Sequence, residues 1–405
     1  MDQDREFDVI VWGASGFTGR LVAEYLFKKY GVGNAVKWAM AGRNQQKLEA
    51  VRDLVADDTV PLITADSHDE ASLDAMTKRA KAICTTVGPY GKYGSKLVAA
   101  CVANQTHYCD LSGEVTWMRQ TIDQHHEAAQ ASKTKIVHTC GFDSIPSDMG
   151  VYFMQKEAIA KTGQYAKRVQ MRVRSSAGGL SGGTYASLND SMEKAAADKY
   201  LRKALIDPYG LNPEGEREGP DEKDLQSVVY DEVSGNWIFP FIMAGINTKV
   251  VRRSNALAGY PYGRDFRYDE AMMGGKGITG RLTSLAATGA IGIVMMAKPG
   301  SLFKKGIDAL FPDPGEGPNQ KQREEGYYNL RFYTTLADGS VAQGKVTGDM
   351  DPGYGSTSKM LAECAISLAQ DSLPDTYGVL TPATAMGDHL LERLQANAGL
   401  TFSFE

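Results

Sequence analysis

The chain has 405 residues and a net charge of −5, and 42% of its residues are hydrophobic. This length predicts two or three domains, at about 150 residues per domain. The composition excludes a disordered, collagen-like or disulfide-rich protein, and a slightly acidic chain gives no sign of nucleic-acid binding. Five cysteines without a CxxC pair predict reduced thiols in a cytoplasmic protein, and the charged N-terminus is unlike a secretory signal.

Strands and helices alternate over the first third of the chain. The apolar run from Phe7 to Trp12 predicts a buried strand, and the helical spacing of apolar residues predicts a helix from Leu21 to Tyr30. More strands are expected over 37–41, 61–65, 82–87, 106–110 and 135–140, and a second helix is expected over 45–55. This alternation predicts βαβ units and a parallel sheet.

The pattern changes after about residue 150. Charged and apolar residues alternate over 168–174, as in a strand with one face in water. Segments 327–335 and 341–347 flank Asp338-Gly339, which predicts a β-hairpin. These signals indicate a sheet that is mostly antiparallel.

The two patterns divide the chain into three parts. Residues 1–150 are expected to form a nucleotide-binding α/β domain, and residues 151–350 a second, α+β domain for substrate binding or dimerisation. The C-terminal segment over 351–405 reads as helical and is expected to pack back on the first domain.

One uncharged segment, 282–297, resembles a membrane span but is too short, since a span needs about 20 apolar residues. It reads as a helix packed in the core or in a homodimer interface. The alternative is peripheral contact of 282–305 with an anionic membrane, in which Lys298, Lys304 and Lys305 face the lipid.

A glycine-rich segment follows the first strand and opens the first helix, and in this context such a segment predicts a dinucleotide site. Pyrophosphate binds the free amides at a helix N-terminus. A tight turn in a sheet without nucleotide is the alternative. The residues that we expect to contact the cofactor here are Gly13, Ser15, Gly16, Phe17, Thr18 and Gly19.

The end of the second strand predicts which nucleotide binds. An acid there usually holds the ribose of NAD, whereas this chain has Arg43, with Lys47 one helical turn later, and both suit the 2′-phosphate of NADP. NADPH is therefore expected in preference to NADH, although Arg43 also reads as a solvated residue at a helix start. Asp66, after the third strand, is expected to meet the adenine edge or to cap its own loop.

Ligands of open parallel sheets lie beyond the carboxyl ends of the strands. Three candidate catalytic residues are Tyr90 and Asp143, which follow such strand ends, and Thr184, in the glycine-rich stretch 178–187. Capping of a helix by Asp143 and a flexible connector over 178–187 are equal alternatives. Further residues expected to contact the cofactor are Thr86, Val87, Gly88, Pro89, Gly141 and Phe142.

Two His-x-Cys pairs, at 107–109 and 138–140, would each place both side chains on one face of a strand. Four such ligands suit zinc, but zinc ligands usually come from loops rather than from a sheet interior. We therefore expect buried core residues here, and no metal.

Taken together, the motifs resemble the saccharopine dehydrogenase-like oxidoreductases, and most closely the branch that includes trans-acting enoyl reductases. The segments that carry the resemblance are 13–19, 41–43, 86–90, 110–114, 140–148, 181–184, 251–257 and 378–383. The resemblance implies an NADP-binding Rossmann domain, a second domain with an antiparallel sheet, and reduction at a site between them.

The resulting hypothesis is an NADPH-dependent reductase of an enoyl acyl thioester, free or carrier-bound, in a lipid-related pathway. Tyr90 or Thr184 would polarise the carbonyl, and Asp143 would orient a loop or the cofactor. One alternative is reduction of a C=N or C=O bond in a small metabolite, whose carboxylate would bind Arg172, Arg174 or Arg252. The other alternative is a non-catalytic scaffold that binds a dinucleotide or associates with a membrane.

Overall fold

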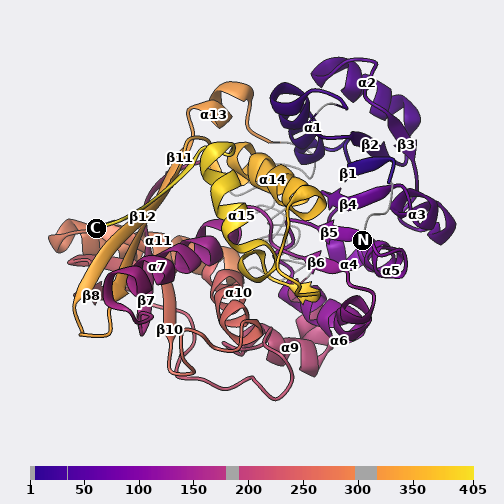
Figure 1. Cartoon of the computed structure of the whole chain (residues 1–405). Helices are drawn as coiled ribbons and strands as arrows, with labels where there is room; N and C mark the ends of the chain where they lie inside the picture. Colours follow the sequence, from indigo (N-terminus) through magenta and orange to yellow (C-terminus); the bar gives the residue numbers. More distant parts are fainter. Residues whose placement is uncertain (1–4, 34, 179–190, 297–316) are drawn as a thin grey trace.

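Two sheets of seven strands each, one parallel and one mixed, form the framework of the molecule over the described residues (Figure 1). A computed structural model describes residues 5–33, 35–178, 191–296 and 317–405. The predicted fold class is confirmed, because a Rossmann-type parallel sheet is joined to an α+β part whose sheet is mostly antiparallel.

Sheet A is entirely parallel and has the strand order β13-β6-β5-β4-β1-β2-β3. Its strands are short apolar runs, as expected for a sheet with both faces covered. Their bounds are β1 Phe7–Trp12, β2 Trp38–Gly42, β3 Leu62–Thr64, β4 Ala80–Thr85, β5 His107–Cys109, β6 Lys135–Val137 and β13 Gly378–Leu380.

Helices cover both faces of sheet A. In β1, Val9 and Val11 face one hydrophobic cluster while Ile10 and Trp12 face the other, which follows from the two-residue repeat of a strand. The first cluster is covered by α1 (Phe17–Tyr30), α2 (Gln45–Val55) and α14 (Thr357–Gln370). The second is covered by α3 (Glu70–Thr77), α5 (Ser95–Ala103) and α6 (Val115–Ala131), and α4 (Tyr90–Tyr93) precedes α5.

Sheet B has the order β14-β12-β11-β7-β10-β9-β8, and only β7 and β10 are parallel among its described strands. Asp338-Gly339 joins β11 to β12 in the predicted hairpin. The strand bounds are β7 Arg168–Ala177, β8 Val229–Asp231, β9 Asn236–Phe239, β10 Arg267–Gly275, β11 Tyr327–Thr335, β12 Val341–Gly348 and β14 Leu400–Phe404. The accompanying helices are α7 Ile145–Thr162, α9 Lys199–Ile206, α10 Ala244–Leu257, α11 Gly277–Met296 and α13 Gln320–Glu324.

The C-terminal segment contributes to both sheets, which differs from the wholly helical segment expected from the sequence. After α14, strand β13 joins the edge of sheet A beside β6, and after α15 (Pro382–Ala396), strand β14 joins the edge of sheet B beside β12. Figure 1 shows α14 and α15 in yellow between the two sheets. One hydrophobic cluster therefore continues from α1 through α14, α15 and α7 to the inner face of sheet B.

Candidate active site

The glycines at the end of β1 occupy positions where a side chain does not fit. Gly13 has a φ of +90°, and a Cβ there would lie 2.6 Å from Cγ2 of Val87. A Cβ on Gly19 would lie 2.2 Å from the carbonyl oxygen of Gly13. This spacing brings α1 against the strand ends, as the phosphate-binding turn of a Rossmann domain requires.

The N-terminus of α1 presents amide groups without competing acceptors. The helix starts at Phe17, its N-cap is Gly16, no side chain among the described residues caps it, and its first turn carries no acid. Ser15 and Thr18 are partly exposed beside this turn. Free amides and a positive helix end without a nearby carboxylate suit a pyrophosphate.

Residues after β4 hold this loop in place. The hydroxyl of Thr86 lies 3.3 Å from the carbonyl oxygen of Gly13 and donates to it, so this side chain buttresses the turn. Val87 lies against the same turn, and its amide donates to Oγ1 of Thr85. Gly88 and Pro89, joined by a cis peptide bond, then lead into α4.

Arg43 and Lys47 stand beside the loop. Both are exposed, and neither side chain forms an ion pair with any described residue. Gly42 places this turn next to the loop, since a Cβ on Gly42 would lie 3.5 Å from Oγ of Ser15. Asn44 caps α2 by accepting from the amide of Lys47, which leaves the cationic ends of Arg43 and Lys47 available for a phosphate.

Asp66 turns into its own loop. Its carboxylate accepts a hydrogen bond of 2.8 Å from the amide of His68, the loop-capping geometry that the sequence left as an alternative. Contact between Asp66 and adenine stays a prediction.

Tyr90 is buried in the hydrophobic cluster on one face of sheet A. Its side chain is 3% exposed and stacks on Trp117 with the ring centroids 5.6 Å apart, and its hydroxyl donates to the carbonyl oxygen of Thr85. Glu114 fixes the start of α4 by accepting from the amides of Tyr90 and Gly91. To donate a proton to substrate, the hydroxyl of Tyr90 would first have to break its hydrogen bond to the carbonyl oxygen of Thr85.

Asp143 has different surroundings. It follows β6, is half-buried, and its carboxylate forms no hydrogen bond or ion pair with the described part of the chain. Oδ2 lies 3.5 Å from the position of a Cβ on Gly113, at the neighbouring strand end, and Ile246 of α10 borders the same point. Burial raises the pKa of this carboxyl to about 7. The third catalytic candidate, Thr184, lies outside the described residues.

Gly141 and Phe142 meet a segment that the sequence analysis did not predict as part of the site. The amide of Phe142 donates to Oγ1 of Thr357 at 3.0 Å, and a Cβ on Gly141 would lie 3.0 Å from the methyl group of Thr357. Phe17 packs edge-on against Tyr354, with the ring centroids 4.8 Å apart. The π-helix η1 (Pro352–Ser356), at the start of α14, therefore covers the nucleotide loop. The feature of the sequence that could have indicated this segment is the Pro-Gly-Tyr-Gly run at 352–355, directly before a helix.

The two His-x-Cys pairs are packed into sheet A. Nδ1 of His138 lies 2.7 Å from Oδ2 of Asp110, and His107 accepts from the amide of Lys135. Cys109 and Cys140 are buried free thiols. Among the described residues, no three His, Cys, Asp or Glu side chains are grouped to hold a metal ion.

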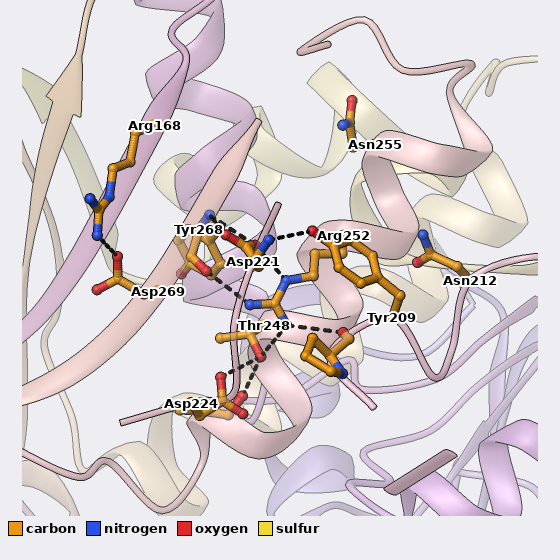
Figure 2. A network of polar contacts seen from close by, with 12 residues as sticks. Arg168, Tyr209, Asn212, Asp221, Asp224, Thr248, Arg252, Asn255, Tyr268 and Asp269 are labelled. Atoms are coloured by element: carbon orange, nitrogen blue, oxygen red, sulfur yellow. Dashed lines mark hydrogen bonds and ion pairs between the residues drawn. The ribbon is translucent and has the colours of Figure 1, made fainter. Parts of the chain in front are cut away.

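Two of the arginines proposed for a substrate carboxylate are already neutralised. The guanidinium of Arg252 binds Asp221 at 2.7 Å and donates to the carbonyl oxygen of Tyr268 (Figure 2). Arg172 is buried between Asp231 and Asp269, at 3.0 and 2.7 Å. Neither cation is free to bind a carboxylate, because an incoming anion would have to displace a protein carboxylate from each.

Comparisons with known proteins agree with this geometry. Residues 9–137 match the saccharopine dehydrogenase NADP-binding domain. Proteins named trans-acting enoyl reductase from Mycobacterium ulcerans and Mycobacterium bovis are 39% and 38% identical to the chain, over 96% of it and 96% of their own length. A Mycobacterium tuberculosis protein with the same name, given provisionally, is 43% identical over 97% of this chain and 96% of its own.

The chain belongs to the saccharopine dehydrogenase-like oxidoreductase family. It is therefore an NADP-binding oxidoreductase, in the branch with the trans-acting enoyl reductases. A solved saccharopine dehydrogenase (L-Glu forming) from Saccharomyces cerevisiae shares the fold, with a TM-score of 0.56 and 11% identity over 98% of this chain and 99% of that one. The resemblance that the motifs predicted is thus confirmed.

Proposed function

We propose that this oxidoreductase uses NADPH to reduce the C=C bond of an enoyl acyl thioester, a substrate of lipid-related pathways. The names of its mycobacterial relatives support the reaction. Arg43 and Lys47 support NADPH over NADH, because only NADPH carries the 2′-phosphate that these exposed cations would bind.

The observation that carries the proposal is the surroundings of Asp143. This carboxyl has no partner among the described residues, and both it and the apolar side chain of Ile246 border Gly113, at a strand end of sheet A. Arg172 and Arg252, two of the three arginines considered for the carboxylate of an amino-acid substrate, are held by their own carboxylates, and the third, Arg174, is exposed on β7. A carboxyl whose pKa is raised to about 7, beside an apolar side chain, suits an uncharged acyl group better than a zwitterion.

In the proposed reaction, the loop over 13–19 with Arg43 and Lys47 would hold NADPH, which would supply the hydride for the β-carbon of the enoyl group. Below its raised pKa of about 7, Asp143 would give its proton to the α-carbon, so that the product is the saturated thioester and Asp143 is left as a carboxylate. Solvent then returns the proton. Thr357 accepts a hydrogen bond from the amide of Phe142, and so holds the turn before Asp143 and positions the acid.

The experiment compares acceptors at saturating NADPH by following its absorbance. We expect oxidation with trans-2-enoyl thioesters and none with a 2-oxo acid plus an amino acid, the pair from which a saccharopine-like imine forms. Turnover of the imine pair alone would contradict the proposal and favour the small-metabolite alternative. NADPH binding without turnover of any acceptor would favour the scaffold.

A further inference from the structure

Helix α11 carries a stripe of apolar side chains that the described chain leaves uncovered. Ile278, Leu282, Leu285 and Ile293 recur at the spacing of one helical face, and all four are exposed, Ile278 by 80% and Leu282 by 61%. Exposed apolar residues gathered on one face, rather than scattered, mark an interaction site. The described residues of the 282–297 segment are therefore not those of a helix packed in the core.

The opposite side of α11 is firmly packed. Small residues, among them Gly280 and Ser284, face β9 and β10. The approach is so close that a Cβ on Gly274 of β10 would lie 1.9 Å from Oγ of Ser284. The fold thus holds this helix with its apolar stripe pointing outward.

The hairpin of β8 and β9 adds exposed apolar side chains next to this helix. Val229, Tyr230 and Val233 are exposed, and the ring of Tyr230 packs on Trp237 with the centroids 5.6 Å apart. Arg281 of α11 lies over the ring of Trp237, at 5.1 Å, which joins the hairpin to the helix. We call the exposed side chains of α11 and of this hairpin the α11 patch.

The charges around the α11 patch favour one class of partner. No acid occurs from Ala271 to Met296, although the whole chain has a net charge of −5. Lys276 and Arg281 are exposed and form no ion pair with described residues, and the hairpin turn carries one exposed acid, Glu232. Apolar side chains flanked by unpaired cations are the pattern of proteins that lie on anionic membranes.

We propose that the α11 patch binds the surface of an anionic lipid bilayer. Leu282 and Leu285 would enter the boundary between headgroups and acyl chains, and Lys276 and Arg281 would meet lipid phosphates. The contact is peripheral, since no helix in the described part of the chain is long and apolar enough to cross a membrane. The proposal does not depend on the proposed reaction.

Flotation of the full chain with lipid vesicles tests whether the α11 patch binds an anionic bilayer. Vesicles of phosphatidylcholine and phosphatidylglycerol in equal parts should carry the protein, pure phosphatidylcholine should carry much less, and added salt should weaken the binding. The double variant Leu282→Ser with Leu285→Ser should lower binding to the mixed vesicles at least about tenfold. Arg281→Gln should reduce the preference for the anionic lipid.

Leu54→Ser with Ile206→Ser is the matched control, because these side chains are 66% and 57% exposed elsewhere on the surface. It should bind vesicles as the wild type does, and NADPH affinity should be equal in all variants, which reports correct folding. Failure to bind mixed vesicles, or equal loss in the control, would overturn the proposal. A wild-type dimer that the Leu282 and Leu285 changes dissociate would overturn it in favour of a second copy of this chain.

Discussion

Arg43 acts at the scale of a single residue. Because its side chain is exposed and unpaired among the described residues, its loss should leave the fold intact and remove one charge-assisted contact to the 2′-phosphate. We expect Arg43→Ala to weaken NADPH binding by about ten- to a hundredfold and NADH binding by less than about twofold. Fluorescence titration measures both, with Arg52→Ala, on the helix α2 that follows Arg43, as the control. Equal losses for the two nucleotides would remove the phosphate assignment.

Asp143 gives the reaction its expected pH dependence. Burial raises the pKa of this carboxyl from its ordinary value near 4 to about 7, so the acid holds its proton below that pH and loses it above. If Asp143 donates the proton, kcat should fall as the pH rises through about 7. Asp143→Asn should lower kcat by about a hundredfold or more and leave NADPH affinity nearly unchanged.

The matched control is Asp57→Asn, at an exposed carboxylate that caps its own turn and has no place in the candidate site. It should keep both the rate and the pH profile of the wild type. An Asp143→Asn enzyme that retains its rate and its decline above neutral pH would show that another group supplies the proton.

At the scale of elements, Asp148 ties three helices together. From α7, its carboxylate accepts from the hydroxyl of Ser254 in α10 and, at 2.8 Å, from the amide of Ala383 at the start of α15. Burial nevertheless raises the pKa of Asp148 to about 7, since desolvation outweighs these two bonds.

This raised pKa predicts how stability varies with pH. The folded state holds the Asp148 proton between about pH 4 and 7 while the unfolded state has released it, so the free energy of unfolding should decrease as the pH rises through this window. Thermal melts at pH 5 and pH 8 should show a lower Tm at pH 8. The difference should shrink in Asp148→Asn and persist in Asp388→Asn, which alters an exposed acid. If Asp148→Asn kept the wild-type difference in Tm between pH 5 and pH 8, Asp148 would not be the cause of the pH dependence.

Elements with strong local patterns could be predicted, and those that depend on a distant neighbour could not. The strands over 168–177, 327–335 and 341–348 carry alternation or a flanking Asp-Gly turn. Gly378–Leu380 is only a three-residue strand, and its identity comes from pairing with Lys135–Val137, far away in the sequence. The same holds for β14, whose partner is β12.

At the scale of the whole molecule, the residues of the candidate site also divide into those that the sequence could predict and those that it could not. The loop over 13–19 and Arg43 are visible in the sequence because each follows a strand directly. Thr357 is not, since it reaches Phe142 across 215 residues. Nor does the sequence reveal that Arg172 and Arg252 are paired, because the pairing acids lie on other elements.

The C-terminal segment joins the two sheets and so should determine cooperativity. Removing residues 372–405 would strip β13 from sheet A and β14 from sheet B, and would expose the apolar faces of α7 and α14. We expect the truncated chain to lose the single cooperative thermal transition of the full chain and to bind NADPH weakly or not at all. Wild-type melting and NADPH affinity after truncation would show that the segment is an appendage.

The most direct test of the central claim follows hydrogen from the nicotinamide to the product. NADPH deuterated at C4, on the transferred face, is incubated with the protein and a trans-2-enoyl thioester, and the product is analysed by mass spectrometry and NMR. Enoyl reduction predicts one deuterium at the β-carbon and a solvent hydrogen at the α-carbon. Deuterium on the carbonyl carbon, or an unreduced enoyl group after full NADPH binding, would contradict it.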